Sequence, residues 1–65
     1  MNFTKNHHII LTVLNDKKRH YIQELAFALD CLPKTVHTYL NDLVRDGLVA
    51  KEPCVFPGVY SYRLA

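Results

Sequence analysis

Apolar positions in the first half of the chain recur at the spacing of α-helices. The first periodic segment runs from about Lys5 to Leu14. At about 100° per residue, one of its faces carries three apolar residues, Ile10, Val13 and Leu14. Ile9 and Leu11 flank that face and make the apolar arc unusually wide. The run "IILTV" is also rich in β-branched residues, which suit a strand, but the length and the i, i+3, i+4 spacing favour a helix.

Two further helices are predicted after the polar loop "NDKKRH". In the segment from about Ile22 to Leu29, apolar residues recur at i, i+3, i+4 and i+7. A third helix is predicted over Pro33–Asp46, because proline suits the first turn of a helix and Gly47 accepts the left-handed conformation that ends one. The core face of this third helix carries Val36, Leu40 and Leu43, with Tyr39 and Val44 at its edges.

After Gly47 the apolar spacing changes from helical to alternating. "LVAKEP" predicts a strand, "CVFPG" a turn and "VYSYRLA" a returning strand. In the returning strand, Tyr60, Tyr62 and Leu64 share one face, and Val59, Ser61 and Arg63 share the other. The predicted fold class is mainly α with a β-hairpin: three helices followed by two strands, in a single domain over residues 1–65.

The composition fits a small and mildly basic globular domain. Of the 65 residues, 49% are hydrophobic and 22% are charged, and the formal net charge is +2. Such a balance permits an anionic partner but falls short of the strongly basic composition that makes nucleic-acid binding obvious. With no apolar stretch near the roughly 20 residues of a membrane span and no signal-peptide pattern, we expect a cytoplasmic protein without a membrane partner. There we expect Cys31 and Cys54 to be reduced thiols.

The side of the third helix that faces away from its core residues is polar. Lys34, Thr38, Asn41 and Arg45 lie opposite the core face, and Thr35 and His37 lie beside them. This stripe suits the DNA major groove, where lysine donates to guanine, asparagine bonds adenine at two points, and threonine offers a methyl and a hydroxyl. The simpler alternative is that any surface helix has a polar face.

The segment "LAFALDCLPKTV", from Leu25 to Val36, resembles the helix-turn-helix pattern of bacterial regulators. In that pattern a Leu-Ala pair is followed by a leucine, a turn residue, an apolar turn residue, and Thr-Val in the next helix. Asp30 stands where the family usually has glycine, and aspartate tolerates the left-handed conformation better than most residues. Cys31 stands at the turn position where a small buried hydrophobe is expected.

The rest of the chain extends this resemblance. "YLNDLVRDGLVAKE" followed by "GVYSYRLA" resembles the helix end and wing of winged helix-turn-helix regulators, so the likeness runs from about Ile9 to Leu64. The short fimbrial-operon regulators of the PapI/FaeA kind are nearest in size and layout. The resemblance implies a phage or bacterial transcriptional regulator that binds double-stranded DNA, with its third helix in the major groove and its wing on the backbone or minor groove.

Two sets of DNA-contacting residues follow from this resemblance. The expected base-contacting residues are Lys34, Thr35, His37, Thr38 and Asn41. The expected phosphate-contacting residues are Lys17, Lys18, Arg19, Arg45, Lys51 and Arg63. Cations on the backbone supply affinity without choosing a sequence.

Some positions depart from the family pattern. Leu32 occupies the place before the third helix where serine or threonine usually caps it, and Asp42 and Asp46 flank the polar stripe where they would repel phosphate. The wing tip "VFPG" is apolar where wings often carry arginine or lysine. These departures leave open a second function, a winged-helix protein-interaction module such as a small inhibitor or adaptor that binds no DNA.

Surplus apolar residues mark the expected partner interface, which serves a homodimer through the first helix or another protein. These residues are Ile9, Leu11, Phe27, Val55 and Phe56.

Catalysis and metal binding have little support. His7 and His8 diverge by about 100° on a helix and make no two-ligand face, so the histidines are expected to be solvated or partly packed. The turn position of Cys31 favours an inert thiol. We expect no enzyme activity, no metal and no cofactor.

Overall fold

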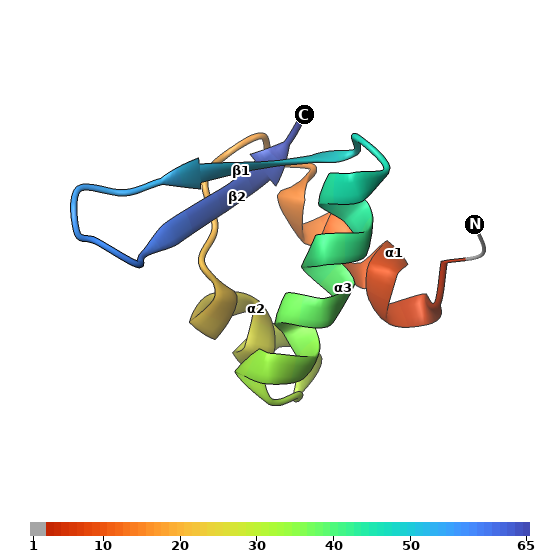
Figure 1. The fold of residues 1–65 in the computed structure, drawn as a ribbon. Helices are drawn as coiled ribbons and strands as arrows, with labels where there is room; N and C mark the ends of the chain where they lie inside the picture. The colour runs from red at the N-terminus through yellow and green to blue at the C-terminus, as the bar shows by residue number, and fades with distance from the viewer. Residues whose placement is uncertain (1–2) are drawn as a thin grey trace.

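The computed structural model describes residues 3–65 and contains three helices followed by one β-hairpin (Figure 1). The elements are α1 (Lys5–Leu14), α2 (Ile22–Leu29), α3 (Pro33–Arg45), β1 (Val49–Pro53) and β2 (Tyr60–Leu64). The predicted order is confirmed, and the segment "IILTV" lies within α1 and not in a strand.

Local sequence explains where the helices begin and end. Thr4 caps α1: its hydroxyl accepts from the backbone N–H of His7, and Nδ1 of His7 accepts from the backbone N–H of Thr4 at 2.9 Å. Asp30 takes the left-handed conformation after α2, with φ of 54°, as its turn position predicts. Leu32 gives α3 no side-chain cap, and Gly47 follows α3 with φ of +78°.

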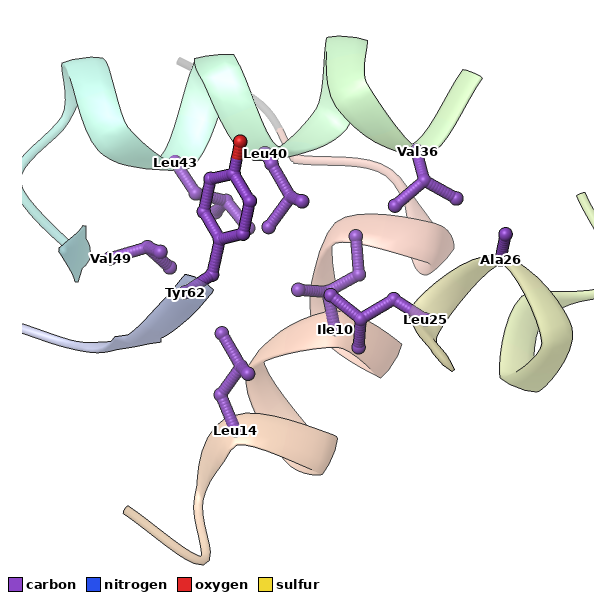
Figure 2. Packing of buried hydrophobic residues seen from close by; sticks show 9 residues of the cluster. All are labelled: Ile10, Leu14, Leu25, Ala26, Val36, Leu40, Leu43, Val49 and Tyr62. Carbon is purple, nitrogen blue, oxygen red and sulfur yellow. The ribbon is translucent and has the colours of Figure 1, made fainter. Parts of the chain in front are cut away.

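Every helix and both strands contribute to one buried core (Figure 2). Its members are Ile10, Leu14, Leu25, Ala26, Val36, Leu40, Leu43, Val49 and Tyr62. The ring of Tyr62 points from β2 towards α3, beside Leu40 and Leu43 (Figure 2). The predicted core face of α3 is therefore confirmed, and its opposite face is directed away from the core.

The hairpin is antiparallel, with Val49 opposite Leu64 and Pro53 opposite Tyr60. His20 pairs with Tyr62 from the other side of β2, and each backbone N–H donates to the other's carbonyl at 2.8 Å. This bridge ties the loop between α1 and α2 to the wing. Beyond it the hairpin projects away from the helices (Figure 1).

Burial along β2 follows the position in the hairpin as well as the face of the strand. Tyr62 is buried, whereas Tyr60, on the predicted same face, is 42% exposed because it lies towards the projecting tip. Ser61 is 1% exposed although it points to the opposite face. The face of the strand alone therefore does not decide which residues of β2 are buried.

Candidate nucleic-acid interface

The outer face of α3 carries the residues that the sequence predicted for it. The side chains at these positions are all exposed: Lys34, Thr35, His37, Thr38, Asn41 and Arg45. None of them is a large apolar residue, and the buried residues of the helix lie on its other side. The face is therefore open to a partner and rich in hydrogen-bonding groups.

Two contacts order this face. The Nδ2 atom of Asn41 lies 3.4 Å from Nδ1 of His37, one turn earlier, and the hydroxyl of Thr38 donates to the backbone carbonyl of Lys34 at 3.3 Å. The carbonyl oxygen and the second N–H of the Asn41 amide remain available, as bidentate contact with adenine requires. The Thr38 hydroxyl retains its acceptor capacity.

Some of the predicted phosphate-contacting cations have partners within the chain. Glu52 pairs with both Arg63 and Arg19, and the distance from Arg19 to Glu52 is 3.9 Å. Arg45 lies 3.4 Å from Asp42. These pairs are exposed on the arginine side, and exposed pairs are weak, so a phosphate competes for them at small cost.

The lysines are less engaged. Lys51 places its ammonium 4.3 Å from the centre of the Tyr60 ring. Lys17 and Lys18 form no ion pair within residues 3–65. Their charges are available to a phosphate backbone.

An open hollow of about 570 Å³ lies between the outer face of α3 and the wing. His37 of α3, Lys51 of β1 and Tyr60 of β2 line it together with the start of α2. Lys17 and Arg63 line a different hollow near the chain end, with Ala65. The structure thus brings His37, a base-contacting candidate, together with Lys51, a phosphate-contacting candidate. It places Lys17 and Arg63 elsewhere.

The predicted interface residues fall into two groups. Phe27 on α2 is 91% exposed, and Val55 and Phe56 at the wing tip are 94% and 71% exposed. Ile9 and Leu11 on α1 are half-buried, and Leu11 packs against the core. The apolar surface is therefore most accessible at the wing tip and on α2.

His7 is buried, so the expectation of solvated or partly packed histidines is wrong for it. Its Nε2 atom lies 3.0 Å from Oδ2 of Asp42, and its ring packs against the rings of Tyr39 and Phe3, with centroids 4.8 and 5.1 Å apart. Because Nδ1 accepts from Thr4, Nε2 carries the hydrogen and donates it to Asp42. Asp42 therefore joins α3 to α1, a role that the sequence did not indicate.

His20 is buried too, and it lies between two carboxylates. Its Nε2 is 2.9 Å from Asp16, and its Nδ1 contacts Glu24. Burial opposes the charged imidazolium, but the hydrogen bonds to Asp16 and Glu24 outweigh it and raise the pKa of His20 above its ordinary value. The hydrogen bond from His20 lowers the pKa of Asp16. The spacing of four residues on either side of His20 is a signal that sequence reasoning missed.

The remaining titratable groups add no candidate chemistry. The neighbouring Cys54 thiol raises the pKa of Tyr21, and burial raises that of Tyr62. Cys31 and Cys54 are free thiols. Across residues 3–65, no group of three or more His, Cys, Asp or Glu side chains has an arrangement that could hold a metal ion, and no helix has the length and apolar character to cross a membrane.

Comparison with known proteins places this geometry in context. The family described as bacterial regulatory protein, arsR family, matches residues 6–51. The adhesin competence repressor AdcR of Streptococcus pyogenes superimposes on 98% of the chain with a TM-score of 0.86 and 25% identity. RV1404 of Mycobacterium tuberculosis superimposes on 98% with a TM-score of 0.86 and 20% identity. No curated protein matches the sequence significantly.

The structural likeness confirms the predicted winged helix-turn-helix architecture. The chain spans 48% of the length of the first of these structures and 44% of the second. The nearer kinship with fimbrial-operon regulators stays a prediction.

Proposed function

The chain belongs to the arsR family of bacterial regulatory proteins, and we propose that it regulates transcription in the cytoplasm by binding duplex DNA at a specific site. The same membership confirms the prediction that this domain is not an enzyme. The observation that carries the proposal is the outer face of α3, where every side chain is exposed and capable of hydrogen bonding.

The dimensions of α3 suit the major groove. The helix has 13 residues, hence a length of about 20 Å, and a helix of about 10–12 Å diameter enters a groove about 12 Å wide. In this arrangement Lys34, Thr35, His37, Thr38 and Asn41 contact base edges. Of these, Asn41 has the geometry for adenine and Lys34 the donor for guanine.

Backbone contacts come from cations on the wing, on α3 and in the loop before α2. Lys51, on β1 of the wing, lines the same hollow as His37 of α3. Arg45 continues the polar face of α3, and the remaining phosphate-contacting residues are Lys17, Lys18, Arg19 and Arg63. Because Glu52 and Asp42 already pair with three of these side chains, a single chain binds with moderate affinity.

A homodimer through α1, with Ile9 and Leu11 at its interface, is part of the proposal because two copies double the phosphate contacts and match a two-fold site. Leu11 is partly used by the core, so Ile9 contributes more of the free surface. Phe27, 91% exposed on α2, favours a second candidate function, binding of a protein partner without DNA.

Selection from random duplexes followed by paired substitutions tests the DNA-binding proposal. Lys34→Ala with Asn41→Ala removes one cation and one amide from the outer face of α3. Lys5→Ala with Asn15→Ala removes the same groups from exposed positions at the two ends of α1.

The first pair is expected to weaken binding to the selected site by at least tenfold, since each good base contact is worth about 1–3 kcal/mol, and the second pair to leave it unchanged. Equal affinities for the two double variants contradict the proposal. A chain that selects no sequence at all but retains a protein through Phe27 supports the second candidate.

A further inference from the structure

The wing tip is apolar and exposed, and it carries no charge. Between Glu52 and Arg63 the sequence holds no charged residue. Val55 and Phe56 lie at the centre of this stretch, 94% and 71% exposed, and neither packs against the core. A tip without charge gains nothing from neutralising phosphates, so its contact with a partner must come from burying apolar surface.

The tip is held in one shape by its own backbone. The N–H of Cys54 donates to the carbonyl of Val59 at 2.9 Å, and the N–H of Val59 donates to the carbonyl of Phe56 at 3.2 Å. Pro57 fixes its own φ, and Gly58 takes a positive φ of 79° that the turn needs. The two apolar side chains are thus presented on a preorganised loop, which lowers the entropy cost of inserting them.

The wing lies beside the outer face of α3. Gly58 and Val59, next to the tip, line the same hollow as His37 on that face, and the hairpin projects beyond the helices (Figure 1). A duplex that lies along the outer face of α3 therefore runs beside the tip.

We propose that Phe56, supported by Val55, inserts into the minor groove as an apolar wedge that partly unstacks a base step and bends the duplex. This inference rests on the proposed function and adds a minor-groove contact of its own. Minor-groove wedges in general use phenylalanine, leucine, isoleucine, methionine or proline and open the groove at a flexible step. Pro57 adds apolar surface to the same loop. Flexible pyrimidine–purine steps are the preferred sites, because they unstack at the lowest cost.

The test measures affinity, bending and salt dependence on one selected duplex. Energy transfer between dyes at the duplex ends reports the bend, and 2-aminopurine placed at each step reports unstacking. The variant is Phe56→Ala, and the matched control is Phe27→Ala, which removes the same side chain from another exposed position, on α2. Phe56→Leu keeps an apolar wedge. Both positions are exposed, so far-ultraviolet circular dichroism serves only to verify that the three variants fold.

We expect Phe56→Ala to lose about tenfold in affinity together with the bend and the 2-aminopurine signal, because stacking on an aromatic ring is worth about that much. The slope of log K against log salt is expected to stay unchanged, since the wedge neutralises no phosphate. Phe56→Leu keeps most of the bend, and Phe27→Ala keeps affinity and bend alike.

Several results overturn the wedge. One is a Phe56→Ala variant with the affinity and bend of the wild type, including the case in which it loses only a protein partner. Another is a loss of affinity accompanied by a shallower salt slope and an unchanged bend, which indicates a backbone contact. If the wild-type chain binds its selected duplex without bending it, the wedge proposal is wrong and the proposed function stands. If the wild-type chain binds no duplex, both are wrong.

Discussion

Asp42 of α3 accepts a hydrogen bond from the buried His7 of α1, with 3.0 Å between Oδ2 and Nε2. The two residues are 35 positions apart in the chain. Through this bond the proposed DNA-contacting helix is fixed to the helix that precedes the turn motif. Asp42 lies at the edge of α3 and is also reached by Arg45, so its charge is partly satisfied inside the domain.

Removing the acceptor at Asp42 is expected to destabilise the fold. Asp42→Ala leaves the buried N–H of His7 without a partner and lowers the free energy of unfolding by about 1–3 kcal/mol. Asp42→Asn retains an accepting oxygen and costs less than half as much. Arg45→Ala, which removes only the exposed partner, costs about 0.5 kcal/mol or less. Urea unfolding of the three variants measures these differences, and equal losses for Ala and Asn at position 42 argue against the bond.

The pH dependence of stability is expected to contain a contribution from His20. Burial opposes its charge, yet the bonds to Asp16 and Glu24 raise its pKa in the folded state. The contribution of His20 to stability is therefore fully present below its pKa in the unfolded state, about 6.5, and is lost as pH rises through its pKa in the folded state. For Asp16, whose pKa is lowered by His20, the contribution is present above about 3.8 and is lost as pH falls through the folded value.

Urea unfolding of the wild type and of His20→Gln, from about pH 5 to about pH 9, measures the contribution of His20 to stability. This range brackets the titration of the imidazole. The stability difference between the two proteins is expected to shrink towards high pH. A difference that grows with pH has the wrong sign for a raised pKa.

A cap at the start of α3 is expected to stabilise the domain. Leu32 makes no side-chain hydrogen bond to the first turn and is 71% exposed, so Leu32→Ser adds an acceptor for a free backbone N–H without emptying the core. The expected gain is about 1 kcal/mol, or roughly 4–8 °C in Tm for a domain of this size. Leu32→Ala is the control and is expected to show no such gain. If the serine variant has the same Tm as the alanine variant, the serine hydroxyl does not act as a cap and the prediction is wrong.

Gly47 is expected to resist substitution for a backbone reason alone. Its φ is +78°, and a Cβ built there meets nothing within 4 Å, so crowding contributes no cost. Gly47→Ala is expected to lose about 1–2 kcal/mol because an L-residue disfavours this conformation. Gly47→Asn loses less, since asparagine tolerates it better. Thermal unfolding of both variants checks the order, and a neutral alanine variant contradicts it.

The elements of this fold were predictable because their signals are local. Apolar spacing, Pro33 at the start of α3 and Gly47 after it act within a few residues, and all five elements were found to within one residue or so. The contacts of His7 with Asp42 and of Arg63 with Glu52 depend on which elements lie side by side. Periodicity does not contain that information, so the sequence indicated solvated or partly packed histidines and free cations where the structure has buried histidines and paired arginines.

The outer face of α3 was predictable for the same reason: once the core face was assigned, its opposite face followed from helical geometry. The distribution of the phosphate-contacting candidates did not follow. Lys51 lies beside α3, whereas Lys17 and Arg63 line a different hollow, because the folding of the hairpin and the loop before α2 decides their places.

The salt dependence of binding to a selected duplex tests the central claim most directly. Each phosphate neutralised contributes about −0.9 to the slope of log K against log salt. Among the six expected phosphate-contacting residues, the three lysines form no ion pair within residues 3–65 and the three arginines are partly paired, so we expect a slope between about −3 and −5 for one chain. A slope near zero, or no duplex binding at low salt, contradicts the proposal that this domain is a DNA-binding regulator.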